Sequence, residues 1–167
     1  MRAKPFLKWA GGKAKLIEQI REQIPTRITS EKFTFIEPFI GGGAMLFWML
    51  NEYPNLEKAV INDINKDLTD SYITVRDDVD KLISILSKWE KEYHKLPEDL
   101  EKKKEYYYEK RELFNSRKSR KTKQSALLIF LNKTCFNGLY RVNSSNLFNV
   151  PIGSYMTPLI CDKENLK

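Results

Sequence analysis

The chain has 167 residues, a net charge of +7 at pH 7 and 41% hydrophobic residues. This length suits one domain or part of a larger one, and the hydrophobic content is sufficient for a core. No apolar run is long enough to span a bilayer, and no apolar signal segment follows residues 1–5, so we expect a cytoplasmic protein with no membrane partner. Two cysteines and one histidine argue against a disulfide scaffold and a zinc cluster, and we expect no metal.

The positive charge is concentrated in one part of the chain. Residues 1–100 carry 15 basic and 16 acidic side chains, whereas residues 101–125 carry 10 basic and four acidic ones. A local excess suits a surface that faces a polyanion. For residues 101–112 alone, a solvated helix face is the simpler interpretation. Residues 115–125 contain five basic residues and no acid, which favours phosphate contact through Lys118, Arg120 and Lys121.

The first block, residues 6–13, contains Gly12-Lys13, which invites comparison with a phosphate-binding loop. That loop requires a glycine where this chain has Leu7 and a hydroxyl where it has Ala14, so the comparison fails. From the residues alone, Trp9 is then a core aromatic and Lys13 a charge at the start of a helix. Apolar residues at helical spacing continue this helix to Ile24, and Pro25 ends it.

A nucleotide-binding half-fold is predicted for residues 33–63. A short buried strand (33–36) leads through Pro38 to a turn with three glycines, Gly41 to Gly43; an apolar helix (44–50), a second strand (58–62) and Asp63 follow. Glycines at such a turn let the backbone approach a ligand, and the distal carboxylate can bind a ribose. The dinucleotide fingerprint requires a third glycine at the position of Leu46. Since the fingerprint serves a pyrophosphate, a nucleoside ligand without a pyrophosphate fits this turn better.

Helical spacing continues after Asp63, and the character of the chain changes at Phe136. We expect helices over residues 65–76, 79–94, 98–115 and 125–135. Residues 136–142 then predict a turn into a strand, 143–146 a turn, and 147–150 a returning strand. Arg and Asn beside an exposed aromatic on such a hairpin are residue types that read base edges and wedge between bases. An ordinary hairpin without this role remains an alternative from composition alone.

Five ordered blocks resemble the Dam-type family of adenine-N6 DNA methyltransferases, and the resemblance covers nearly the whole chain. The blocks are residues 6–13, 37–44, 62–65, 136–141 and 148–153. The resemblance implies an α/β fold, with a partial Rossmann-like class I methyltransferase core and an inserted, mostly helical target-recognition region that ends in a β-hairpin. The division it implies is residues 1–68 for the cofactor-binding part, 69–158 for target recognition, and 159–167 for the start of the return to the core.

The cofactor that the resemblance implies is S-adenosylmethionine. Trp9 and Lys13 would line its cleft, which replaces the simpler readings given above. Phe39, Gly41 and Gly43 would form the floor under the methionine part, and Asp63 would hold the ribose hydroxyls.

The partner implied is double-stranded DNA with a GATC-like target site. Phe136 would be the wedge beside the target base, and Arg141 would read a guanine, since a guanidinium matches its O6 and N7 acceptors. Pro151 would contact a thymine methyl group, and Lys8 would reach a base or phosphate from the cofactor side. Asn137 and Asn143 are the further DNA-contacting candidates.

The family's catalytic tetrapeptide, of the Asp-Pro-Pro-Tyr type, is absent from the sequence. In the family's order it follows the recognition region, so we expect it downstream of Lys167 and predict no catalytic residue within this chain. The expected function is therefore that of an adenine-specific DNA methyltransferase of a restriction-modification system, which needs its remaining C-terminal part for activity. A DNA-binding module without chemistry of its own is the alternative.

Overall fold

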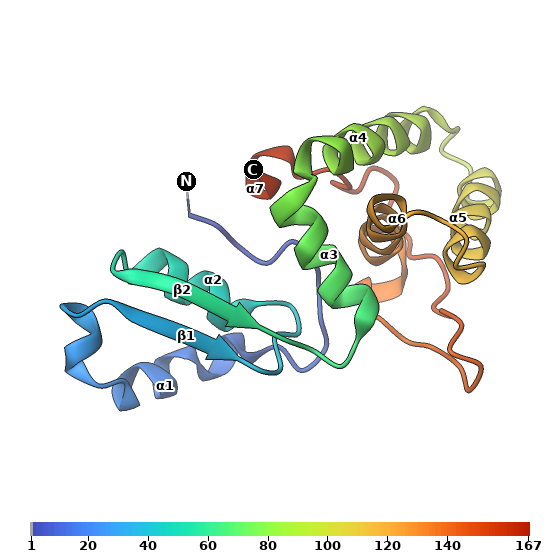
Figure 1. Ribbon diagram of the computed structural model, residues 1–167. Coiled ribbons are helices and arrows are strands. Elements are labelled where there is room, and N and C mark those ends of the chain that lie inside the picture. Colours follow the sequence, from blue (N-terminus) through green and yellow to red (C-terminus); the bar gives the residue numbers. More distant parts are fainter. Residues whose placement is uncertain (1) are drawn as a thin grey trace.

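The computed structural model describes residues 2–167 and shows a mixed α/β arrangement (Figure 1). Two parallel strands and seven α-helices are formed within this range. The strands are β1 (Phe33–Glu37) and β2 (Leu56–Ile61). The helices are α1 (Ile17–Gln23), α2 (Ala44–Glu52), α3 (Lys66–Asp77), α4 (Val79–Lys95), α5 (Leu100–Asn115), α6 (Lys121–Thr134) and α7 (Lys163–Leu166). Every helix predicted from apolar spacing is present, with ends displaced by a few residues.

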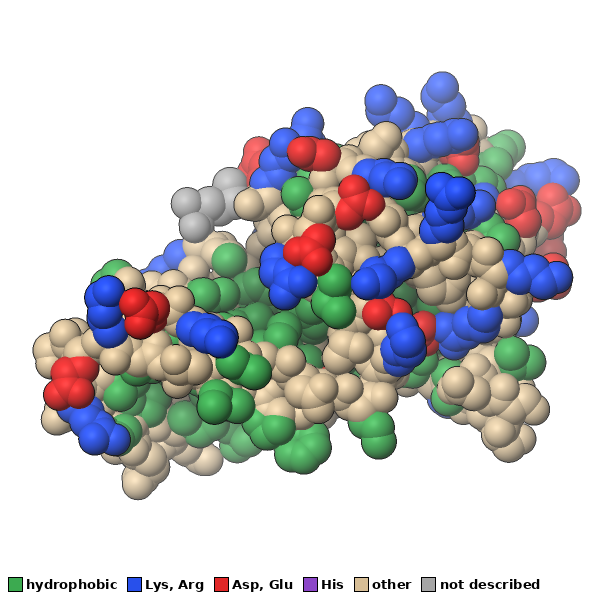
Figure 2. Space-filling model, viewed as in Figure 1, with side chains coloured by type: hydrophobic (Ala, Val, Ile, Leu, Met, Phe, Trp, Pro, Cys, Tyr) green, Lys and Arg blue, Asp and Glu red, His purple; other side chains and the backbone are tan. Residues whose placement is uncertain are grey.

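The sheet and its connecting helix form the predicted β1–α2–β2 unit. β1 pairs with β2 in parallel, with Phe35 opposite Ala59 and Glu37 opposite Ile61. The aromatic side of β1 packs against α1 and α2, in a cluster around Met45, Trp48 and Met49. The opposite side of the sheet is uncovered: Ile36 is 66% exposed and Val60 41%. Figure 2 shows hydrophobic side chains gathered over this part of the molecule.

The carboxyl ends of the two strands are held side by side by their loops. Asn62 donates its N–H to the Glu37 carbonyl, and Ile40 donates its N–H to the Asn62 carbonyl, both at 2.9 Å. The glycine turn then enters α2 through Gly43, whose φ is +82°. A Cβ at this position would lie 2.4 Å from the Tyr72 hydroxyl oxygen. Only glycine tolerates both the conformation and the contact.

The larger part of the molecule is helical and is built around α6. This helix contacts α3, α4 and α5, and its residues 125–132 are buried throughout. In Figure 1, α3 stands between the sheet, which α1 and α2 accompany, and the helices α4, α5 and α6. Its Tyr72 packs edge-on against Phe6 of the N-terminal segment at 5.0 Å between ring centroids. The N-terminal segment and α3 therefore join the sheet to the helical part.

The lysine-rich face of α5 is only partly solvated, which corrects the simple expectation for residues 101–112. Lys103 is 1% exposed; its Nζ donates to the carbonyls of Tyr93 at 3.1 Å and Met156 at 3.0 Å. Lys110 is also buried, with its Nζ 4.2 Å from the Tyr106 ring centroid. Their apolar stems pack among aromatics. Two carbonyls satisfy the ammonium group of Lys103, and that of Lys110 pairs with Glu109 at 3.0 Å besides facing the Tyr106 ring.

The two strands predicted for the hairpin are reduced to one isolated antiparallel bridge, between Val142 and Phe148. The chain does turn back here, since Asn149 donates its N–H to the Arg141 carbonyl at 3.1 Å. The backbone groups of Phe148 are bonded to a side chain instead of a further strand: its N–H donates to Asn115 Oδ1 at 2.8 Å, and its carbonyl accepts from Asn115 Nδ2 at 3.0 Å. These groups point away from residues 136–142, since the ladder bonds here are those of Asn143 with Leu147 and of Asn149 with Arg141. The bonds of Phe148 therefore anchor the excursion to α5.

Within residues 2–167, no helix combines the length and the apolar character needed to cross a membrane. Cys135 and Cys161 are both free and buried, as expected for reduced thiols.

Candidate functional site

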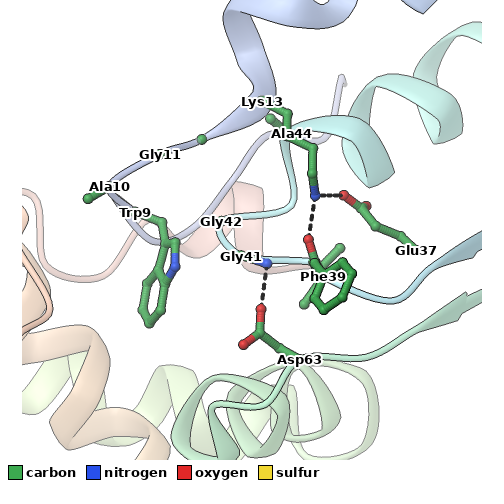
Figure 3. Close-up of a pocket in the computed structure, with 12 residues that line it drawn as sticks. Trp9, Ala10, Gly11, Lys13, Glu37, Phe39, Gly41, Gly42, Ala44 and Asp63 are labelled. Carbon is green, nitrogen blue, oxygen red and sulfur yellow. Dashed lines mark hydrogen bonds and ion pairs between the residues drawn. The ribbon is translucent and has the colours of Figure 1, made fainter.

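A cavity of about 220 Å³ lies at the carboxyl ends of β1 and β2 (Figure 3). Ligands of open α/β sheets bind at this edge. The cavity is lined by Trp9, Ala10, Gly11, Gly12, Lys13, Glu37, Phe39, Ile40, Gly41, Gly42, Ala44 and Asp63. Five of the six predicted cofactor residues are in this set. The sixth, Gly43, is outside it and forms the N-cap of α2.

Asp63 connects the loops that follow the two strands. Its Oδ2 accepts the N–H of Gly41 at 3.0 Å, and its Oδ1 accepts the N–H of Asn65 at 3.0 Å. The Gly41 carbonyl in turn accepts from the Tyr72 hydroxyl at 3.1 Å. Gly41 has a φ of +51°, and a Cβ there would lie 3.2 Å from Cδ1 of Trp9. The glycine turn is thus held between Asp63, Tyr72 and Trp9.

Lys13 and Glu37 form an ion pair at the wall of the cavity, with 2.8 Å between Nζ and Oε1. Lys13 also donates to the Phe39 carbonyl. Burial raises the pKa of Glu37, although the bond and charge of Lys13 oppose that shift. The other carboxylate oxygen, Oε2, is buried and has no hydrogen-bond partner among the described residues. The wall of the cavity therefore holds a cation paired with a carboxylate.

Two aromatic rings flank the glycine turn. Figure 3 shows Trp9 and Phe39 on either side of Gly41. Phe39 is 72% exposed, an unusual position for a phenylalanine unless something covers it. Trp9 is half-buried and stacks on Tyr140, with 5.1 Å between ring centroids and an interplanar angle of 26°. A planar group in the cavity would find aromatic surface at both of its edges.

Four predicted DNA-contacting residues lie together next to the Trp9 segment. Phe136 is 51% exposed and donates its N–H to the Pro151 carbonyl at 2.9 Å. Asn137 has a φ of +54°. The next residue, Gly138, packs so tightly against the Lys8 side chain that a Cβ at position 138 would lie 2.4 Å from Lys8 Cδ. The segment that reaches the cavity and the segment proposed to read bases are therefore in direct contact.

Two residues in these groups escaped the sequence analysis. Buried Asn132 accepts the Lys8 N–H at 2.9 Å and donates to the carbonyls of Lys8 at 2.9 Å and Gly138 at 2.8 Å. A polar residue in an otherwise apolar helix was its only signal, because such a group needs partners when buried. Glu37 is the first residue of the block 37–44, but nothing in its sequence context assigns it a role. Its pairing with Lys13 is a tertiary contact.

Arg141 and Asn143 lie farther along the same excursion, and both are exposed. The Arg141 Nε donates to Asn149 Oδ1 at 2.7 Å, which orients the guanidinium. Asn143 uses its side-chain oxygen to accept the N–H groups of Ser145 and Leu147, at 3.0 and 2.9 Å. It therefore shapes the turn, a role that the sequence analysis did not assign to it.

The three basic residues Lys118, Arg120 and Lys121 are exposed, and none forms an ion pair with a described residue. They lie beside a second cavity, of about 680 Å³, that Lys121 and Asn146 both line. Arg117 of the same loop is different, because it pairs with Asp67 of α3. Figure 2 shows most Lys and Arg side chains over the helical part of the molecule. No group of three or more His, Cys, Asp or Glu side chains within residues 2–167 is arranged to hold a metal ion.

A parallel β–α–β unit with a glycine turn after its first strand and an acid after its second is an arrangement typical of nucleotide-binding α/β proteins. The sequence model of the D12 class N6 adenine-specific DNA methyltransferases matches residues 9–167, and the chain belongs to this family. It is 49% identical over 170 residues to the type II methyltransferase M.MjaIII of Methanocaldococcus jannaschii, covering 100% of this chain and 58% of that protein.

Two further relatives are also methyltransferases that this chain matches over about half of their length. The type II methyltransferase M1.LlaDCHI of Lactococcus lactis subsp. cremoris is 40% identical over 96% of this chain and 51% of its own length. A DNA adenine methylase of Haemophilus influenzae is 38% identical over 94% of this chain and 49% of its own length. The chain thus spans about half the length of these curated relatives.

Proposed function

We propose that this chain provides the cofactor pocket and the target-recognition surface of a site-specific adenine-N6 DNA methyltransferase that uses S-adenosylmethionine. One observation carries the proposal. The cavity at the strand ends and the exposed cluster around Phe136 are joined through two consecutive residues: Trp9 lines the cavity, and Lys8 packs against Gly138. A methyl donor and a base turned out of DNA must meet at such a junction.

The cavity residues fit S-adenosylmethionine. Lys13 offers a cation to the carboxylate of the amino-acid part, and the carboxylate of Glu37, which also lines the cavity, attracts its ammonium group. Asp63 accepts one backbone N–H on each carboxylate oxygen; each oxygen retains a lone-pair site for a ribose hydroxyl. Phe39 and Gly41 form the floor, and Gly43 starts α2 below it. When bound, the cofactor supplies an activated methyl group.

The site requires additional chain to be complete. Its volume of about 220 Å³ is below the roughly 300–1,000 Å³ of typical ligand pockets. The uncovered face with Ile36 and Val60 can pack against further elements of a class I, Rossmann-like sheet. We infer that sequence following the recognition region supplies these elements and the Asp-Pro-Pro-Tyr type tetrapeptide.

We propose the division of the chain into residues 1–68, 69–158 and 159–167 on this basis. Asn165 supports the return to the core after residue 158, because its side chain exchanges two hydrogen bonds with the Lys4 backbone, each at 2.9 Å.

On the DNA side, exposed Phe136 is the wedge that supports the opened stack, and Arg141 reads a guanine with the guanidinium edge not bonded to Asn149. Pro151 contacts a thymine methyl group, and Lys8 contacts a base or phosphate. Asn137 and Asn143 are further DNA contacts of the recognition excursion. Lys118, Arg120 and Lys121 neutralise phosphates independently of sequence.

A GATC-like target is proposed from the resemblance of this recognition segment to that of the Dam-type enzymes. Two relatives are named type II methyltransferases, and we propose the corresponding restriction-modification role for this chain, in the cytoplasm.

The chemistry required of the protein is mainly positioning. N6 transfer needs the amine held in line with the methyl group, and a base out of the stack. Residues of this chain bind the cofactor, exclude water with Trp9 and Phe39, and hold the opened DNA with Phe136. The groups that hold the amine are assigned to the downstream tetrapeptide.

The decisive test is a radiolabelled methyl-transfer assay on a GATC-containing duplex. The protein that contains this chain and its downstream sequence should transfer methyl groups to adenine N6. It should lose activity when one base pair of the GATC site is changed. Residues 1–167 alone should show no transfer, weak cofactor binding and salt-sensitive DNA binding. Multiple turnovers by residues 1–167 alone would show that we have misplaced the catalytic groups. DNA binding without transfer by the complete protein would favour a binding module.

A further inference from the structure

Tyr140 lies between the cavity and the recognition excursion. One face of its ring stacks on Trp9, as described above, and its edge meets Phe148 with 5.9 Å between centroids and an interplanar angle of 61°. Phe148 is itself fixed by the two backbone bonds to Asn115. The Tyr140 ring thus supports Trp9, which lines the cavity, and is itself held in place by Phe148.

The hydroxyl of Tyr140 makes a separate contact. It donates to Oδ2 of Asp67 at 3.0 Å, while Arg117 pairs with Oδ1 of the same carboxylate. Burial, with the Asp67 charge as a smaller contribution, raises the pKa of Tyr140. The hydroxyl therefore stays protonated near neutral pH and remains a donor.

These two contacts connect both parts of the proposed site. Asp67 is in the first turn of α3, two residues after Asn65, whose N–H is bonded to Asp63. Arg141 directly follows Tyr140 in the chain. A displacement of the Tyr140 ring would remove the surface on which Trp9 stacks. Loss of its hydroxyl bond would remove one of the contacts that hold the chain next to Arg141, beside the bond from the Asn149 N–H to the Arg141 carbonyl.

We propose that Tyr140 is a positioning residue that fixes the Trp9 wall of the cofactor pocket and the base-reading Arg141 relative to one another. Its ring acts on the cofactor side and its hydroxyl on the DNA side. The inference rests on the proposed function, because it assigns the cofactor and guanine-reading roles to the two neighbours. Sequence analysis gave Tyr140 no role.

The experiment uses the complete protein, with Tyr140→Phe and Tyr140→Met. The first keeps the ring and removes the hydroxyl; the second keeps much of the volume and removes the ring. Tyr108→Phe is the matched control, because Tyr108 is also half-buried but lies on α5 against Tyr107. Calorimetry with S-adenosylhomocysteine without DNA gives cofactor-pocket affinity. The ratio of Kd values for a GATC duplex and for one with a G·C pair changed to A·T gives discrimination.

Tyr140→Phe should lower the discrimination about 3- to 10-fold and leave the S-adenosylhomocysteine Kd within twofold of wild type. Tyr140→Met should also raise that Kd about 3- to 10-fold, and Tyr108→Phe should change neither quantity. The inference is overturned if discrimination in Tyr140→Phe, or the Kd in folded Tyr140→Met, stays within twofold of wild type. Should Tyr140→Met not fold, the Tyr140→Phe result decides. A wild-type protein that neither binds S-adenosylhomocysteine nor discriminates would instead refute the proposed function.

Discussion

Replacing Asp63 by alanine separates two tasks that the structure gives to one carboxylate. The carboxylate accepts two backbone N–H groups at 3.0 Å each, from Gly41 and Asn65, and it lines the cavity. Hydrogen bonds to a charged group contribute about 1.5–3 kcal/mol each. Asp63 is only half-buried, so the low end applies, and the free energy of unfolding should fall by about 2–3 kcal/mol.

The same change should weaken cofactor binding. Loss of the bond to the ribose hydroxyls removes about 1.5–3 kcal/mol, which corresponds to a roughly 10- to 150-fold higher Kd for S-adenosylhomocysteine. Asp63→Asn keeps one neutral acceptor oxygen and should show intermediate losses in both quantities.

The assays are denaturant unfolding and isothermal calorimetry on the complete protein. Asp77→Asn is the control, since that exposed carboxylate pairs with Arg76 and lies outside the set of cavity residues. Lower stability of Asp63→Ala with unchanged affinity would leave Asp63 a turn-holding residue and refute the ribose contact. Unchanged stability would refute the hydrogen-bonding scheme of the glycine turn.

Four further predictions concern other parts of the site. Burial raises the folded-state pKa of Glu37 above its ordinary value of 4.5. The contribution of Glu37 to the free energy of unfolding is therefore fully present below pH 4.5 and is lost as the pH rises through the raised pKa. Denaturant unfolding of wild type and Glu37→Gln over this pH range should show the loss as a shrinking difference between the two proteins. Gly43→Ala should cost at least about 1 kcal/mol of unfolding free energy, because φ is +82° and the new Cβ meets Tyr72; a thermal midpoint equal to wild type would contradict the turn geometry. Arg141→Ala should lose roughly 1–3 kcal/mol of discrimination at one guanine position, measured by binding to duplexes altered at single pairs, and equal weakening on all sequences would make it a phosphate contact. Neutral replacement of Lys118, Arg120 and Lys121 together should instead weaken the binding of all DNA sequences alike and reduce the salt dependence of binding.

Neither half of the site is built from one element. The cavity takes residues from the N-terminal segment, from the turn after β1 and from the end of β2. The surface around Phe136 takes Lys8 from the N-terminal segment and Pro151 from the far end of the excursion. Residues 6–9 serve both halves, so a change in this segment is expected to affect cofactor and DNA binding together.

The sequence by itself determined the local elements and the half-fold. Apolar spacing predicted the helices, because each buries one face or its whole circumference. The order of strand, glycine turn, helix, strand and acid placed Asp63 beside Gly41, because carboxyl ends of adjacent parallel strands share one edge. The five blocks identified the family, and the match to residues 9–167 bears this out.

Tertiary structure decided which charged and polar groups are buried and what they meet. Lys103 has the local pattern of a solvated lysine, yet carbonyls of Tyr93 and Met156, ten and 53 positions away, enclose it. The predicted hairpin strands are a single bridge in the structure, and Phe148 is anchored to α5 by both of its backbone groups through Asn115. Glu37 and Tyr140 acquire their contacts with Lys13, Trp9 and Asp67 only when distant segments pack. Periodicity reports which face of an element is apolar; it carries no information on the partners that packing brings to a single polar atom.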